Sequence, residues 1–239
     1  MISVLDTHIH SIASGHARST IAECARAAVA AGIQLIAITD HAPGMPDTAL
    51  LSHFANLHVL PRDMFGVTLL RGVELNIIDY NGCVDMSDGQ IRGLDVRIAS
   101  LHPPCITPGT VVQHTAAITG AMRNPLIQVI GHLGDPLYPF DLDAVLDVAA
   151  ETGTVIEINN LSLDPNSPAR CGGEATVRTI ATGCLQRGLP VIMGSDAHVH
   201  TSVGVHHYAQ ALLEELGFPD ELVLNTSVSL FYARMGMAR

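Results

Sequence analysis

The chain has 239 residues, 48% of them hydrophobic, and a mean hydropathy of +0.32, values typical of a compact globular protein and not of a disordered chain. It carries 12 basic and 23 acidic residues, a net charge of −11, with only 4% aromatic residues, which argues against a surface for long nucleic acids. All the basic residues are arginines, so a P-loop lysine, a Schiff-base lysine and a carbamylated bridging lysine are excluded.

Short apolar runs alternate with helical patterns along the chain, which is typical of βα units. The sequence predicts strands at 2–6, 34–39, 67–72, 96–100, 127–130, 155–158 and 191–193. It predicts helices at 20–31, 109–122, 142–151, 174–187 and 205–216, with 218–235 as a capping tail. The strands are β-branched and nearly continuous in apolar character, as strands covered on both faces are, so we predict about seven parallel strands in a closed β/α barrel. An open doubly wound sheet is the alternative, but it needs a glycine-rich turn after its first strand.

No uncharged apolar run reaches the roughly 18–20 residues that a membrane helix needs, and no basic leader segment opens the chain. The five cysteines are odd in number and include no C-x-x-C pair. Both features favour free thiols in a reducing compartment. We therefore expect a cytoplasmic protein without a membrane partner.

Histidines and carboxylates follow the predicted strands, and thirteen histidines in this length direct attention to metals. Because the carboxyl ends of barrel strands meet at one face, residues far apart in sequence come together there. In an extended chain, residues two apart share a face. His8 and His10 can therefore bind one ion, and Asp196 and His198 are paired in the same way. The further candidate ligands are His16, His41, Glu74, His102 and His132.

Each candidate has a simpler explanation when it is taken alone. A loop histidine is more often solvated than metal-bound, and Glu74 could form a salt bridge with Arg71. A simpler explanation of this kind would have to apply separately at every strand end. Taken together, the residues therefore predict a metal site. The other six histidines lack this placement and are interpreted as structural or surface residues.

These residues resemble the PHP family, named for polymerase and histidinol phosphatase, and above all its stand-alone YcdX-type phosphatases. The likeness runs nearly end to end. It covers Asp6-Thr7-His8-Ile9-His10, Thr39-Asp40-His41, Gly72-Val73-Glu74, the two later strand-end histidines, Glu157-Ile158-Asn159-Asn160 and Ser195-Asp196-Ala197-His198. The resemblance implies one domain over 1–239, a distorted seven-stranded TIM-like barrel and a trinuclear zinc or manganese site. It also hints at a homotrimer.

The resemblance further implies how the ligands are shared among three divalent ions. The first ion would be held by His8, His10, Glu74 and Asp196. The second would be held by Glu74, which bridges, with His102 and His132. The third would be held by His16, His41 and His198. Ala197, where this branch often has serine, is a departure that should alter a hydrogen bond and not a ligand.

The function expected from these residues is hydrolysis of small phosphate monoesters by a hydroxide bridging two metal ions. Glu74, Asp196 and His198 are the expected catalytic residues. Mixed histidine and carboxylate ligands suit zinc, manganese or iron better than magnesium. Candidate substrate contacts are Arg18, Arg62, Arg170 and Asn160, although a solvated arginine explains each of the three arginines equally well.

Three other functions stay open. One is a phosphodiesterase or exonuclease acting on small nucleotides. Another is an amidohydrolase-type C–N hydrolase, which also begins with His-x-His but usually bridges its metals with a modified lysine that this chain lacks. The third is a metal-binding module without catalysis. Activity toward an aryl phosphate compared with an aryl phosphodiester would separate them.

Overall fold

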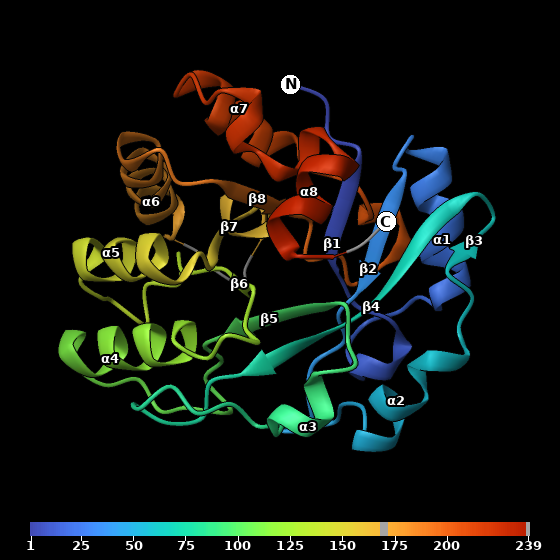
Figure 1. Ribbon diagram of the computed structural model, residues 1–239, viewed down its shortest axis with the longest axis horizontal. Coiled ribbons are helices and arrows are strands. Elements are labelled where there is room, and N and C mark those ends of the chain that lie inside the picture. The colour runs from blue at the N-terminus through green and yellow to red at the C-terminus, as the bar shows by residue number, and fades with distance from the viewer. Residues whose placement is uncertain (168–171, 238–239) are drawn as a thin grey trace.

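Seven parallel strands form one strongly curved sheet in the computed structural model, which describes residues 1–167 and 172–237 (Figure 1). Their order in the sheet is β1 (Leu5–Ile9), β2 (Leu35–Ile38), β4 (Val67–Asn76), β5 (Val96–Ser100), β6 (Val129–Ile130), β7 (Val155–Asn159) and β8 (Val191–Gly194). An isolated bridge between Ile9 and Ala197 brings the first strand to the last, so the barrel is nearly closed. The predicted distorted, seven-stranded barrel is confirmed.

Helices lie outside the strands and follow them in the chain, as βα units require. They are α1 (Ile21–Ala30), α4 (Val111–Met122), α5 (Leu142–Thr152), α6 (Glu174–Arg187) and α7 (His207–Glu215). Thr20 caps α1 in a capping box with Glu23, which satisfies two backbone N–H groups that the helix leaves unpaired. Gly188, in a left-handed conformation, ends α6 where the sequence predicts its end. In the described ranges, no helix combines the length and apolarity needed to cross a bilayer.

The amino-terminal end of the barrel is closed by α8 (Val228–Met235). Its Phe231 is fully buried and packs in one apolar cluster with Leu5, Val96, Val129 and Val155, each the first residue of its strand. The predicted capping tail is therefore confirmed. Because this end is filled with apolar side chains, the opposite rim is left for polar chemistry.

Two strands reach further toward that rim than the sequence predicts. The first strand, expected at 2–6, lies at 5–9, and the strand expected to end at Gly72 continues to Asn76. The prediction ended each strand near its first polar residues. Backbone pairing does not depend on side-chain polarity, and the β4 ladder with β5 continues through Glu74 and Asn76. As a result, His8 and Glu74 lie inside strands and not beyond them.

Several short elements between β2 and β5 are absent from the sequence prediction: α2 (Leu51–Asn56), β3 (Asp63–Met64) and α3 (Asp88–Ile91). The strand β3 pairs with the start of β4 through a two-residue turn, Phe65-Gly66. Both turn residues have positive φ, 60° and 95°, as a type I′ hairpin requires.

Short 3-10 turns also connect the main elements along the described chain. They are η1 (Ile12–Ser14), η2 (Leu57–Val59), η3 (Leu161–Leu163), η4 (His200–Ser202), η5 (Asp220–Leu222) and η6 (Leu224–Thr226).

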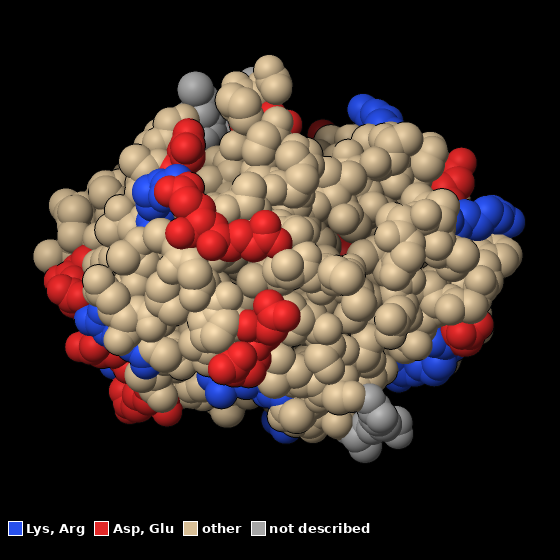
Figure 2. All heavy atoms as spheres, turned by 90° about the horizontal axis from the view of Figure 1, so that it is seen from above, with Lys and Arg blue, Asp and Glu red and all other residues tan. Residues whose placement is uncertain are grey.

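Charged side chains of both signs are mixed on the surface. On the face in Figure 2, arginines lie singly beside acidic side chains, separated by wide uncharged areas. Arg178 pairs with Glu215 at 2.8 Å and Arg187 with Asp143 at 2.6 Å. These arginines thus neutralise part of the acidic charge locally.

Candidate metal centre

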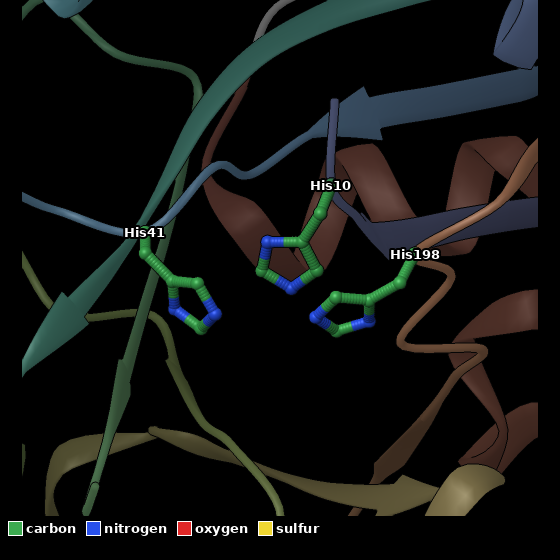
Figure 3. Close-up of side chains that lie close together, drawn as sticks. All are labelled: His10, His41 and His198. Carbon is green, nitrogen blue, oxygen red and sulfur yellow. The ribbon is translucent and has the colours of Figure 1, made fainter. Parts of the chain in front are cut away.

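Nine histidine and acidic residues meet at the carboxyl-terminal rim of the barrel. They are His8, His10, His16, His41, Glu74, His102, His132, Asp196 and His198, and all nine are the ligands that the sequence predicts. Strands or strand-end loops carry eight of them, while His16 follows η1. The rings of His10 and His41 are 4.3 Å apart between centroids, and those of His10 and His198 are 4.4 Å apart. Figure 3 shows these three rings turned toward one another.

Glu74 lies at the centre of the group and is fully buried. Its Oε1 is 2.8 Å from Nε2 of His132 and 3.2 Å from Nε2 of His102. Its Oε2 is 2.7 Å from Nδ1 of His41 and 3.4 Å from Nε2 of His8. Nε2 of His10 lies 3.6 Å from the same Oε2. One carboxylate thus faces five imidazoles, two through Oε1 and three through Oε2, which is an arrangement that can bridge cations.

Asp196 and His198 bring the loop after β8 into the same group. Oδ1 of Asp196 lies 3.3 Å from Nε2 of His10. Nε2 of His198 lies 2.9 Å from Nε2 of His16. His16 is the outermost and most exposed member of the group. Asp196 has a φ of 55° and His132 a φ of 25°, a left-handed conformation that is uncommon outside glycine.

Four buried ring nitrogens of the group are left without hydrogen bonds within the described chain. The unpartnered buried atoms include Nε2 of His8, His10 and His102, Nδ1 of His41 and Oε2 of Glu74. A buried polar group without a partner is costly, and a divalent cation is a partner that satisfies nitrogen and carboxylate lone pairs at once. Four sets of three such ligand atoms lie within 4.8 Å of one another. The residues therefore fit divalent metal ions.

The local electrostatics favour the neutral form of some of these imidazoles and the ionised form of Glu74. His8 is the exception, because burial lowers its pKa but the carboxylates of Glu157, Glu74 and Asp196 outweigh burial and raise that pKa well above the ordinary value. Burial and the neighbouring His41 lower the pKa of His10 to about 3, and burial lowers the pKa of His102 to about 4. Burial opposes ionisation of Glu74, but the surrounding imidazoles hold its pKa well below the ordinary value. A neutral imidazole has a free lone pair, so these groups are ready to coordinate a metal at neutral pH.

Comparison with known proteins places the chain in a family. The sequence pattern of the PHP domain matches residues 6–167. The chain belongs to the PHP domain family. A protein of Acetivibrio thermocellus named "probable phosphatase" is 45% identical to this PHP protein over 228 residues, which are 95% of this chain and 93% of the relative. A second probable phosphatase, of Caldanaerobacter subterraneus, is 47% identical over 226 residues, 94% of this chain and 88% of the relative.

Solved structures share the fold of this PHP protein at low sequence identity. The histidinol phosphate phosphatase of Lactococcus lactis, solved with zinc, L-histidinol and phosphate, superposes with a TM-score of 0.62 at 18% identity. The alignment covers 92% of this chain and 95% of the other. A putative histidinol phosphatase of Listeria monocytogenes gives 0.61 at 15% identity, covering 86% of this chain and 99% of that one. With phosphatases as close relatives over nearly its whole length, the PHP protein is a hydrolase.

Side chains behind the ligands hold the rings in place. Nδ1 of His102 lies 2.7 Å from Oδ1 of Asn76, whose amide in turn donates to Asp85 at 2.6 Å. Asp40 accepts from Ser14, whose hydroxyl lies 3.3 Å from Nδ1 of His10. Asp40 belongs to the quoted Thr39-Asp40-His41 motif, whereas Asn76 is in none of the motifs named from the sequence. The signal for Asn76 was present, because it lies two residues after Glu74 and therefore shares its face.

The predicted substrate contacts are less consistently placed at the rim than the nine candidate ligands. Arg62 pairs with Asp95, which precedes β5, so it lies away from the carboxyl end of that strand, where His102 is found. Arg62 is not at the predicted substrate site because the β3–β4 hairpin takes residue 62 away from the rim. Oδ1 of Asn160 accepts from the N–H groups of Tyr208 and Ala209 and so fixes the first turn of α7, although the residue also lines the cavity.

Arg18 is not among the described residues that line the cavity. Arg18 is exposed in the loop beside the rim, where its guanidinium donates to the carbonyl of Gly15 at 2.8 Å and its backbone N–H to the carbonyl of His198. Arg170 lies outside the described residues.

A cavity of about 590 Å³ opens onto the group of nine. His16, His41, His102, Asp196 and His198 form part of its wall. This volume suits a small molecule, and the cavity gives such a molecule direct access to the candidate metal ligands.

Proposed function

We propose that this PHP protein is a metal-dependent phosphomonoesterase whose single domain, residues 1–239, holds three divalent cations at the barrel rim. The observation that carries the proposal is the set of buried, unpartnered nitrogen and carboxylate atoms facing one another beneath an open cavity. The phosphatase names of its relatives support the same reaction class.

The proposed ligand sets follow the predicted grouping. One ion is assigned to His8, His10, Glu74 and Asp196, a second to Glu74, His102 and His132, and a third to His16, His41 and His198. The close set of His8, His10 and Asp196 supports the assignment of the first ion, and the sets that contain Glu74 support its bridging place between ions. His10 also lies close to His41 and His198, so the first and third sets adjoin.

The chemistry divides between the cations and the protein. Bound divalent cations supply Lewis acidity for the phosphoryl oxygens and lower the pKa of water enough to make a nucleophile near neutral pH. Glu74 and Asp196 hold charge of the opposite sign in a buried place, which keeps the cations close together. Nδ1 of His198 donates to the carbonyl of Asp196 at 2.8 Å, so the lone pair of the neutral ring is on Nε2, the atom that lies 2.9 Å from Nε2 of His16. We assign Glu74, Asp196 and His198 as the catalytic residues.

The ligand types also bear on which metal is used. Seven imidazoles and two carboxylates form a set that suits zinc, manganese or iron, whereas magnesium prefers oxygen ligands and water. The small cavity favours a phosphorylated small molecule as the substrate.

The test is hydrolysis by the full chain loaded with Mn²⁺ or Zn²⁺, using an aryl phosphate, the matching aryl phosphodiester and an aryl amide. We expect cleavage of the phosphate monoester to dominate. His8→Ala and Asp196→Ala should abolish it and reduce the metal content measured by elemental analysis. His58→Ala is the matched control, because His58 is exposed on η2 and its Nδ1 contacts only the local carbonyl of Ala55 among the described atoms. Full activity in either ligand variant would defeat the assignment, and preferred cleavage of the diester or amide would favour an alternative.

A further inference from the structure

A buried glutamate outside the proposed ligand set contacts two of the ligands. Glu157 lies in β7 and is 3% exposed. Its Oε1 is 2.6 Å from Nδ1 of His8. Its Oε2 accepts from the backbone N–H of His132 at 2.7 Å and from the side-chain amide of Asn159 at 3.2 Å. Both carboxylate oxygens are therefore already occupied by hydrogen bonds from the protein.

We propose that Glu157 is a positioning residue of the metal centre, which sets the ring of His8 and the backbone of His132 for metal binding. The inference rests on the proposed function, because it concerns the same centre. It adds a residue that neither coordinates the cations nor touches the substrate, and that acts through two ligands at once.

The contact with His8 selects which ring nitrogen can bind a metal. A carboxylate accepts a hydrogen bond, so a neutral His8 ring beside Glu157 has its proton on Nδ1 and its lone pair on Nε2. That Nε2 is 3.4 Å from Oε2 of Glu74 and 3.7 Å from Oδ1 of Asp196, and it has no hydrogen-bond partner in the described chain. A carboxylate on the far nitrogen also makes the ligating nitrogen more basic. Glu157 thus directs His8 toward the two carboxylates of the centre.

The contact with His132 stabilises an uncommon backbone conformation. His132 has a φ of 25°, which brings its Nε2 to 2.8 Å from Oε1 of Glu74. A residue with a side chain occupies this region only when its surroundings hold it there. The hydrogen bond from the N–H of His132 to a buried carboxylate is charge-assisted and therefore among the stronger kinds. Glu157 is positioned to stabilise this backbone conformation of His132.

Two neighbours show that the barrel accommodates this carboxylate. A Cβ built on Gly194 of β8 would lie 1.9 Å from Oε1 of Glu157 and 3.0 Å from Cβ of His8. Glycine is therefore needed at this point for Glu157 and His8 to meet. The amide of Asn159 donates both to Glu157 and to Oδ2 of Asp196, at 3.3 Å, which extends the contact to a third ligand.

The first test compares Glu157→Gln with the wild type in the full chain. Glutamine keeps the size of the side chain but presents one oxygen and one NH₂ group, so it can accept from only one of the two donors, His8 Nδ1–H and His132 N–H. We expect the affinity for Mn²⁺ and Zn²⁺, measured by competition with a chelating dye, to fall about 10- to 100-fold. The visible absorption spectrum of the Co²⁺-loaded protein should also change, which a merely structural role would not require. Glu151→Gln is the control, since Glu151 is exposed on α5.

A second variant, Gly194→Ala, reaches the same carboxylate from the other side, and it decides the question if Glu157→Gln does not fold. Its added methyl group should displace Glu157 and reduce metal affinity in a similar way. Where both single variants fold, their losses should not add in the double variant, because both act on one contact. Circular dichroism and thermal unfolding without metal identify the variants that keep the fold.

The outcomes separate this inference from the proposed function. Wild-type metal affinity and an unchanged Co²⁺ spectrum in a folded Glu157→Gln or Gly194→Ala variant would overturn the role of Glu157 and leave the proposed function standing. A wild-type chain that binds Mn²⁺, Zn²⁺ and Co²⁺ no better than the His8→Ala variant would overturn both.

Discussion

Asp40 provides a quantitative test of how the rim is held together. Its carboxylate is 1% exposed, and it accepts from the N–H and the hydroxyl of Ser11, each at 2.7 Å, and from the hydroxyl of Ser14 at 2.6 Å. Nε2 of His53 lies 3.2 Å away. Asp40→Asn removes the charge and turns two N–H donors toward groups that already donate, so we expect the variant to be less stable.

The size of the loss follows from the pKa of the carboxyl. Burial opposes ionisation of Asp40, but hydrogen bonds from His53, Ser14 and Ser11 and the proximity of His10 outweigh it and lower the pKa from 3.8 to about 2. At about 1.4 kcal/mol for each pH unit, this corresponds to about 2.5 kcal/mol of unfolding free energy. For a chain of this size the melting temperature would fall by roughly 5–10 °C.

The pH dependence has a definite sign. Because the folded-state pKa of Asp40 lies below the unfolded value, its stabilisation is fully present above about pH 4 and is lost as the pH falls toward 2. The deficit of Asp40→Asn relative to wild type should therefore be constant between pH 7 and pH 5 and shrink to roughly half by pH 3.

Denaturant unfolding of the metal-free proteins at pH 7, 5 and 3 measures this deficit. Asp147→Asn is the control, because the side chain of Asp147 is 73% exposed and 3.5 Å from Arg187, and it should cost less than about 1 kcal/mol. A deficit below about 1 kcal/mol for Asp40→Asn at pH 7, or one of the same size at pH 3, would refute the reasoning.

Three further predictions concern the metal, the substrate contacts and the barrel floor. Removal of the metal by a chelator should lower the melting temperature by roughly 8–16 °C for each cation whose free concentration was 1,000 times its Kd. Scanning fluorimetry before chelation, after chelation and after re-addition of the metal measures this change. Arg62→Ala should leave kcat/KM for an aryl phosphate within about twofold of wild type, since Arg62 pairs with Asp95 away from the rim. A tenfold loss would show instead that Arg62 contributes to the active site. Phe231→Ala should cost about 3–5 kcal/mol of unfolding free energy without changing metals bound per folded chain, as calorimetry and elemental analysis would show.

The sequence predicts the barrel and the nine rim residues well because both depend on chain-local patterns. Apolar runs mark the strands, and the carboxyl ends of parallel strands meet in space whatever the intervening loops do. Strand ends are harder to predict, since β4 continues through Glu74 and Asn76 although both are polar. The place of Arg62 depends on a hairpin that only backbone pairing reveals. The oligomeric state and the cytoplasmic location stay predictions.

The supporting residues escaped prediction for a related reason. Glu157, in the quoted stretch Glu157-Ile158-Asn159-Asn160, carries no sequence signal that it meets His8, which is 149 positions away. Its partner at the close approach, Gly194, reads as an ordinary strand-end glycine until the contact is known.

The position of His8 and Glu74 within paired strands links assembly of the barrel to metal uptake. Side chains of a strand alternate between its two faces, so a slip of β1 by a single residue would turn His8 to the other face, and a slip of β4 would do the same to Glu74. A misaligned barrel would then lack one of the groups proposed to bind the cations, in the case of β4 the carboxylate that the imidazoles surround. Binding of the proposed cations would therefore favour the correctly aligned chain over a misaligned one.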